Sequence, residues 1–145
     1  ISDLCTLVES PIIINEFKEY MPILLSHLKD SSIGASVQII IVSLIGDTFL
    51  LTKDDFGPYL EESLNILEDA SKHCSQISEE VFKKPDELLS FVQYQGALIE
   101  AYTCFVQNIK SVREEHYQIL GTHIYNIFGF LMDIIHPNFD PSEVR

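Results

Sequence analysis

The stretch SLIGDTFLLTKDDFGPYL, residues 43–60, contains the end of a long apolar run and the start of an amphipathic segment. The apolar run covers residues 37–51 and is broken most sharply at Gly46-Asp47. Strands usually extend over ~3–10 residues, whereas the pattern from residue 34 to 51 covers about eighteen. We therefore predict a helix here, despite the many β-branched residues. A membrane span needs ~18–20 predominantly apolar residues without a charge, so Asp47 argues against one.

The segment that follows, residues 58–73, has the period of an amphipathic helix. Leu60, Leu64 and Leu67 fall at i, i+4 and i+7, which places them on one side of a helix. Pro58 suits a first helical residue because its missing N–H has no helical partner there. The predicted polar side consists of Glu61, Glu62, Asn65, Glu68, Asp69 and Lys72.

Three further segments are predicted to be helical. One repeats the apolar pattern around Met21 and carries Pro22, which we place in the first turn because N–H groups there lack internal partners. A second covers residues 85–110 and opens with Pro85-Asp86-Glu87, acids that suit the positive end of a helix dipole. The third covers residues 119–135 and is stopped by Pro137. Residues 74–84 have no clean period and are predicted to form a loop.

Self-similarity in the chain predicts a repeat architecture. FKEYM at 17–21 aligns with FGPYL at 56–60, so that Tyr20 and Tyr59 are 39 positions apart, and SDLCTL at 2–7 aligns with GDTFLL at 46–51, an offset of 44. A helix pair that recurs every ~40–47 residues is typical of HEAT and armadillo proteins. One pair cannot bury both of its apolar faces, so neighbours must stack. We predict an all-α HEAT-repeat solenoid of antiparallel helix pairs in a superhelical stack.

Within that array we assign four parts. Residues 1–15 are the end of an inner helix, 16–53 one helix pair, 54–111 a second pair with the loop 74–84, and 112–145 the start of a further repeat. The chain has no initiator Met, begins inside an apolar pattern and has no basic leader. We therefore expect a fragment of a longer array, without a signal peptide, whose uncapped ends favour self-association.

Gly46 and Asp47 have a structural role in such an array. A glycine lets a neighbouring helix approach closely, at ~1 kcal/mol of helix propensity. A carboxylate at a fixed place in each inner helix, Asp47 and its counterpart Asp3, can accept hydrogen bonds from the next repeat. Direct contact with a ligand, or catalysis, are the alternatives for Asp47.

Composition limits the partners. The 145 residues include 22 acidic and nine basic side chains, for a formal net charge of −13. Nucleic acids and anionic membrane surfaces both require basic side chains, so neither is expected, and a basic protein segment is the natural complement. The three cysteines, Cys5, Cys74 and Cys104, are widely spaced without CxxC, which favours buried thiols in a reducing compartment.

Motifs for catalysis, metals and cofactors are not found in the sequence. The five histidines lack HExxH or a companion cysteine spacing, and no nucleophile-elbow, Walker or Rossmann glycine pattern occurs. Asp54-Asp55 lacks the second acidic cluster that a diphosphate–metal site needs, and the region has no EF-hand spacing. We expect no enzyme activity, no cofactor and no metal.

SLIGDTFLL, DDFGPYLEESLNILEDAS and GALIEAYTCFVQNIK, in this order, resemble the importin-β (karyopherin-β) family, and SDLCTLVESPIIINEF is similar to the end of a preceding inner helix. The resemblance covers most of residues 2–135. It implies a nuclear import receptor found in cytoplasm, nucleus and nuclear pore. Such receptors bind a basic import signal, or the basic adaptor segment of importin-alpha, on an acidic concave face. They contact phenylalanine-glycine nucleoporins on the outer face, and they release cargo when the GTPase Ran binds in its GTP form. The principal Ran-binding repeats of the family lie in its N-terminal part.

Two candidate surfaces follow from the residues. A polar stripe recurs every seven positions on the helix 85–110, and together with two acids of the preceding loop it is a candidate cargo site: Asp86, Gln93, Glu100, Gln107, Glu79 and Glu80. An ordinary solvated face is the alternative. A groove between outer helices could take a phenylalanine side chain, with inter-repeat core as the alternative: Tyr20, Leu24, His27, Tyr59, Leu60 and Leu64. A transport receptor segment and a purely structural HEAT scaffold both fit the sequence.

Overall fold

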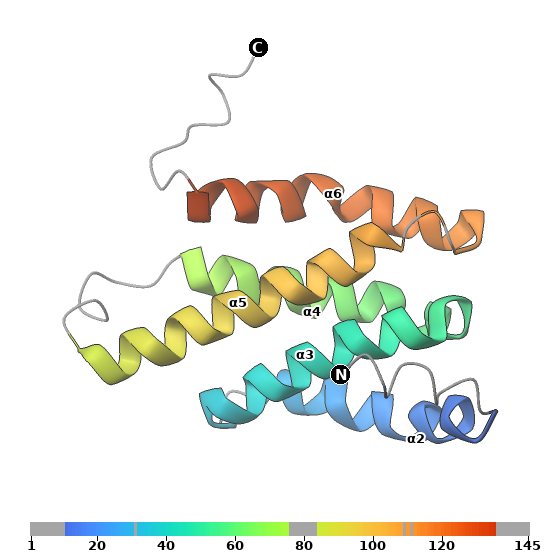
Figure 1. Ribbon diagram of the computed structural model, residues 1–145, viewed down its shortest axis with the longest axis horizontal. Helices are drawn as coiled ribbons and strands as arrows, with labels where there is room; N and C mark the ends of the chain where they lie inside the picture. Colours follow the sequence, from blue (N-terminus) through green and yellow to red (C-terminus); the bar gives the residue numbers. More distant parts are fainter. Residues whose placement is uncertain (1–10, 31, 76–83, 109, 111, 136–145) are drawn as a thin grey trace, which may run out of the picture.

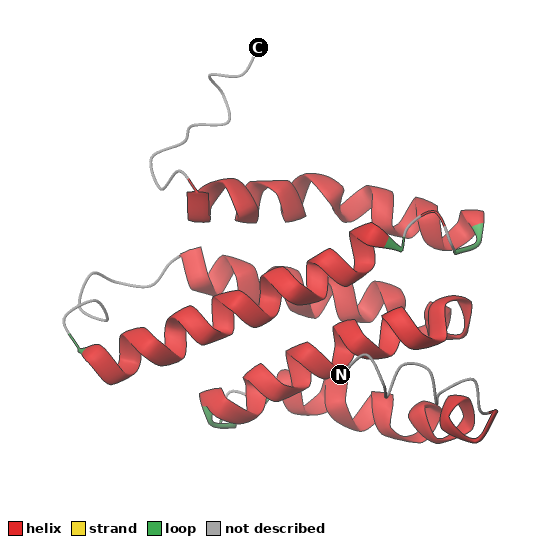
Figure 2. Ribbon diagram, viewed as in Figure 1, coloured by secondary structure: helices red, strands yellow, loops and turns green. Residues whose placement is uncertain are grey.

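The computed structural model describes residues 11–30, 32–75, 84–108, 110 and 112–135. These residues form α2 (Pro11–Leu28), α3 (Ala35–Thr52), the 3₁₀ turn η1 (Lys53–Phe56), α4 (Gly57–Ser75), α5 (Pro85–Gln107) and α6 (Glu114–Ile135). Within these ranges the chain contains no strand, as Figure 2 shows. The apolar run around Gly46 is therefore a helix, as its length predicted.

The helices form two layers. In one layer α4 contacts α2 on one side and α6 on the other, and in the second layer α3 packs along α5. Figure 1 shows α4 passing behind α5, with α6 and α2 at opposite ends of the stack. This alternation of helices between two layers confirms the prediction of an all-α repeat solenoid. We call α2, α4 and α6 the outer layer and α3 and α5 the inner layer.

The predicted boundary at residue 15 is wrong. Residues 11–15 belong to α2, which begins at Pro11 and contains Pro22 in its interior. Pro11 is the residue that occupies the first helical position, where a missing N–H costs nothing. Pro22 is therefore not in the first turn, as predicted, but in the middle of the helix.

Aromatic rings at the start of α4 connect the two layers. Phe56 of η1 is fully buried, and its ring lies 5.5 Å from that of Phe49 in α3 and 6.0 Å from that of Phe105 in α5. The Phe49 and Phe105 rings are 4.5 Å apart, and Phe17 of α2 stacks on Phe56 at 6.4 Å. Such ring pairs contribute ~0.5–1.5 kcal/mol beyond their buried area. They hold the outer helices at a fixed position relative to the inner layer.

Gly46 is a point where α3 and α5 approach closely. A Cβ atom added at Gly46 would lie 2.8 Å from the Cα atom of Ala101 and 3.3 Å from its Cβ atom. Ala101 and Ala97 of α5 are both buried. Small side chains on both helices therefore allow the close contact that we predicted for this glycine.

One helical stretch, residues 35–75 through α3, η1 and α4, is long and apolar enough by length and composition to qualify as a candidate membrane span. The core helix of a soluble protein passes the same test. Here α3 packs along α5, and α4 packs between α2 and α6.

Candidate functional site

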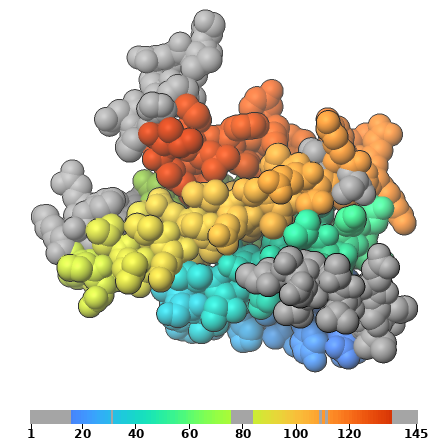
Figure 3. All heavy atoms as spheres, viewed as in Figure 1, coloured from blue at the N-terminus to red at the C-terminus, as the bar shows by residue number. Residues whose placement is uncertain are grey.

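The predicted polar stripe lies on the exposed surface of α5. Asp86, Gln93, Glu100 and Gln107 are all solvent-exposed, whereas the opposite side of the helix buries Leu98, Tyr102 and Phe105. Figure 3 shows α5, in yellow to orange, together with α3 on the face of the molecule turned to the viewer. Glu79 and Glu80, the other two predicted cargo residues, lie outside the described residues.

Part of this stripe borders a groove between the two inner helices. Gln93 and Glu100 of α5 face Ser36, Ile39 and Ser43 of α3 across a depression of about 460 Å³ that also includes Gly96 and Ala97. The small residues Gly96 and Ala97 keep the groove open between the longer side chains. Asp86 and Gln107 do not line it, so the groove contains the middle of the predicted stripe only.

Charge on the inner layer has a single sign. Neither α3 nor α5 contains a Lys, Arg or His, whereas α3 contains Asp47 and α5 contains Asp86, Glu87 and Glu100. Burial and then the nearby carboxylates of Asp47 and Glu100 raise the pKa of the Cys104 thiol. Both helices therefore contribute negative potential to the same part of the surface, next to the groove.

Asp47 does not have the hydrogen-bonding role that we predicted. Its side chain is exposed, and no donor within the described ranges bonds to its carboxylate.

Asp54 in η1 has that role instead: its Oδ1 atom accepts the backbone N–H of Arg113 at 2.7 Å and lies 3.1 Å from Nδ1 of His116. These hydrogen bonds, the backbone one foremost, lower the pKa of Asp54. One polar contact between successive repeats is thus made at the helix starts. Asp3, the predicted counterpart of Asp47, lies outside the described residues.

Gly57 completes this contact between the starts of α4 and α6. A Cβ atom at Gly57 would lie 2.1 Å from Nε2 of His116, so the imidazole ring occupies the space of a side chain at that position. His116 is buried with a relative exposure of 7%. The glycine therefore lets the ring pack on the first turn of α4 while Nδ1 faces Asp54.

Two of the residues that we predicted to line a groove for a phenylalanine side chain do not line one. Leu60 and Leu64 are 1% and 0% exposed, so they belong to the core, which was the alternative. Tyr59 is half-buried: its ring packs edge-on against Phe17, and its hydroxyl donates a hydrogen bond to the carbonyl of Lys18. Leu24 is also partly buried against the core. Tyr20 and His27 are exposed.

A groove does exist past the end of α2, mainly between α3 and α4. It has a volume of about 840 Å³ and an apolar floor that includes the buried Val42 and Leu67. At its rim Nζ of Lys29 lies 2.6 Å from Oε1 of Glu62. The other lining residues are Leu28, Ile33, Ala35, Gln38, Asn65, Ile66, Asp69, Ala70, His73 and Tyr94.

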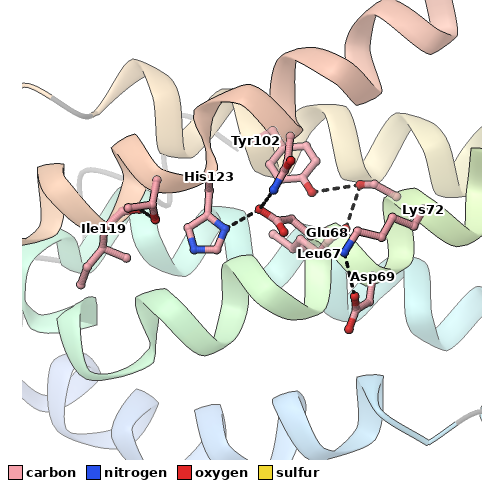
Figure 4. Close-up of polar contacts among 10 residues, drawn as sticks. Leu67, Glu68, Asp69, Lys72, Tyr102, Ile119 and His123 are labelled. Atoms are coloured by element: carbon pink, nitrogen blue, oxygen red, sulfur yellow. Dashed lines mark hydrogen bonds and ion pairs between the residues drawn. The ribbon is translucent and has the colours of Figure 1, made fainter.

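A buried polar network joins α4 to α6, and the sequence reasoning missed it. Glu68, predicted on the polar side of its helix, is only 9% exposed. Its Oε1 atom accepts hydrogen bonds from Nδ2 of Asn126 at 2.9 Å and from Nδ1 of His123, as Figure 4 shows for His123. The spacing of His123 from the buried Leu120, Ile127 and Phe130 was the signal that could have placed it on the inner side of α6.

Tyr102 of α5 joins the same region. Its ring is buried, and its hydroxyl lies 2.9 Å from Oγ of Ser71, which also donates to the carbonyl of Leu67. Burial raises the pKa of the Tyr102 hydroxyl well above its usual range. Ser71 and Glu68 lie one helical turn apart on α4, so the inner and outer layers are linked by polar contacts at this point.

The fold and these surfaces define a class: an all-helical repeat stack with an acidic inner layer and no cluster of three or more potential metal ligands in the described part of the chain. The chain belongs to the importin subunit beta-1-like family. The family model, described as Importin subunit beta-1-like, TPR repeats, matches residues 1–144. This family is of a non-enzymatic transport-receptor type. No solved structure matches the chain.

The family description names TPR repeats, whose unit is ~34 residues long. The outer helices of this chain begin at residues 11, 57 and 114, and are therefore 46 and 57 positions apart. The first spacing agrees with the HEAT period that the sequence predicted. The second is longer mainly because α5 has 23 residues where α3 has 18.

Proposed function

We propose that the chain is a segment of a nuclear transport receptor. It binds a basic import signal, or the basic adaptor segment of importin-alpha, along its inner layer, and phenylalanine-glycine nucleoporins on its outer layer. It acts in Ran-regulated protein import, in the cytoplasm, the nucleus and the nuclear pore. Family membership supports this proposal, as does the absence of basic residues from both inner helices.

The inner groove supports a basic helical segment as the ligand. Glu100 and Gln93 line it, and Asp47 adds a carboxylate from α3. Exposed ion pairs contribute only ~0.2–1 kcal/mol each, so several must act together along the stripe. Screening by salt weakens such exposed pairs, and the affinity should therefore fall steeply as ionic strength rises.

Charge reversal tests the inner surface. The double variant Asp86→Lys and Glu100→Lys should bind a Lys/Arg-rich helical peptide about tenfold more weakly, since two attractions of up to ~1 kcal/mol each become repulsions. The matched control is Glu19→Lys with Glu61→Lys, two exposed acids of the outer helices α2 and α4. Fluorescence anisotropy at low and physiological salt measures both. Equal weakening by the two pairs would show non-specific attraction and refute an inner site.

For the nucleoporin contact we propose the groove past the end of α2, mainly between α3 and α4. Its apolar floor and half-buried lining residues Ile66 and Ala70 suit a phenylalanine side chain. A phenylalanine-glycine peptide titrated into isotopically labelled protein should shift the amide resonances of Ile66 and Ala70 in a saturable way. A peptide with serine in place of phenylalanine is the control. Equal shifts with both peptides, or no saturable shift, would contradict the site.

A structural scaffold for a multiprotein complex is the second candidate, because the same two-layer stack can hold partners without transporting them. Ligand choice separates the two. A transport receptor segment binds both the basic peptide and the phenylalanine-glycine peptide, whereas a scaffold binds neither.

A further inference from the structure

A second groove lies on the outer layer, between α4 and α6, and nothing in the proposed function uses it. Its volume is about 290 Å³. The residues that line it come from two stretches, one on each helix: Glu68, Ser71, Lys72, Ser75, Tyr125, Asn126, Gly129, Phe130 and Asp133. We infer that this groove binds two arginine side chains of an extended basic segment of a partner protein.

The first observation is the free oxygen of a buried carboxylate. Both donors to Glu68, His123 and Asn126, reach the same atom, Oε1. Across the described ranges no donor reaches Oε2, although the side chain is 10% exposed. Oε2 is not among the fully buried polar atoms that lack a partner in the described residues, so it is open to solvent and to a ligand. Because Glu68 lines the groove, a donor that enters there can bind this oxygen.

Asp133 supplies a second carboxylate at the other end of the groove. It accepts a hydrogen bond from Oγ of Ser75 at 3.2 Å, and no cation from the described residues pairs with it. Glu68 and Ser75 are seven positions apart on α4, which corresponds to about 10 Å along the helix axis. The two carboxylates are therefore spaced for two cationic groups and not for one.

The only basic side chain that lines the groove is Lys72, and its ammonium is directed to Asp69. Nζ of Lys72 lies 3.4 Å from Oδ1 of Asp69, as Figure 4 shows. The two groove carboxylates therefore outnumber the single lysine, whose charge is shared with a third acid. This balance favours a cation in the groove over an anion.

Tyr125 and Gly129 favour arginine over lysine as the side chain that binds in the groove. Tyr125 is 84% exposed at the rim, so its ring can stack on a guanidinium, which favours arginine over lysine. Gly129 has no atom within 4 Å of a Cβ position, so that part of the groove is open. In an extended segment of polyproline II conformation, with three residues per turn and ~3.1 Å rise per residue, side chains three positions apart lie on the same side and about 9 Å apart. An Arg-x-x-Arg segment therefore matches the spacing of Glu68 and Asp133.

The test is a titration of the 145-residue chain with Ac-Gly-Arg-Gly-Gly-Arg-Gly-NH₂, followed by the amide resonances of Asn126, Gly129 and Asp133. We expect saturable shifts that weaken with salt, and at least fivefold weaker binding when both arginines are replaced by citrulline, the neutral isostere. Equal binding of the citrulline peptide would overturn the proposal.

Two variants locate the site. Gly129→Leu fills the open part of the groove without removing a charge, and Asp133→Asn removes one carboxylate. Each should weaken binding at least fivefold. Glu19→Gln changes the net charge by the same amount as Asp133→Asn but is exposed on α2 and does not line the groove, so it should leave binding unchanged. If Asp133→Asn and Glu19→Gln have equal effects, or wild-type shifts do not saturate, the proposal is refuted. Inner-layer binding is measured with other variants, so either proposal can fail alone.

Discussion

Replacing Gly46 with alanine places a methyl group between α3 and α5, where the two helices approach closely. The new Cβ atom would lie 2.8 Å from the Cα atom of Ala101, whereas carbon atoms in contact are normally ~3.5–4.0 Å apart. The neighbouring atom belongs to the backbone, so a rotamer change cannot relieve the contact. The two helices must therefore separate by about 1 Å at this point.

Two opposing terms give the magnitude. Alanine is favoured over glycine in a helix interior by ~1 kcal/mol, and overpacking of a close-packed core costs ~1–3 kcal/mol. We expect a net loss of about 1 kcal/mol in the free energy of unfolding of Gly46→Ala. Urea unfolding followed by circular dichroism measures it.

The control is Gly121→Ala in α6, where no atom lies within 4 Å of the Cβ position. Here only the propensity term acts, so this variant should gain ~1 kcal/mol. The difference between the two variants, about 2 kcal/mol, isolates the steric cost of separating α3 from α5. If Gly46→Ala is stabilised as much as Gly121→Ala, the close approach of the two helices is refuted.

Three further outcomes are expected. The pKa of Asp54 is lowered in the folded state, mainly by the hydrogen bond from the Arg113 backbone, so its contribution to stability is present above the pKa of the unfolded state and is lost as pH falls through the folded value. Acid unfolding of Asp54→Asn should accordingly lack that pH-dependent part; an unchanged acid profile would contradict the role of Asp54. Tyr102→Phe should cost ~0.5–1.5 kcal/mol in urea unfolding and show coupling with Ser71→Ala in a double-mutant cycle, and additive effects would argue against the hydrogen bond. Glu68→Leu should destabilise by ~1–3 kcal/mol, because it leaves the buried imidazole of His123 without its acceptor; a neutral result in the same assay would rule out the buried network.

The helices could be predicted from the sequence because their signals are local. The length of the apolar run identified α3, Pro85 marked the start of α5, and α6 ends at Ile135 as predicted before Pro137. The role of Gly46 could also be predicted, because a glycine inside a long apolar helix removes the side chain that would keep a neighbouring helix at a distance. Pro22 was misplaced because two prolines in one segment, Pro11 and Pro22, each give the signal of a helix start.

The polar contacts could not be predicted, because their partners are distant in the chain. Glu68 lies at the edge of the apolar stripe of α4, where a carboxylate is normally solvated, and its partners His123 and Asn126 follow 55 and 58 positions later. The same holds for Asp54, whose partner Arg113 is 59 positions away. Helical periodicity gives the side of one helix on which a residue lies, but not which residue of another helix meets it.

The two layers differ in what holds them, and this difference bears on function. The outer layer is joined by specific polar contacts, from Asp54 with His116 at one end to Ser75 with Asp133 at the other. The inner layer is joined by close packing at Gly46 and Ala101 and needs no charge for that contact. Its acids nevertheless lie on two helices that contain no basic residue, and of these acids Glu87 is paired with Lys84, which precedes α5. The packing of the inner layer does not require these acidic side chains, which share a single sign of charge. A basic ligand would offset their charges. This argument favours the transport receptor over the scaffold.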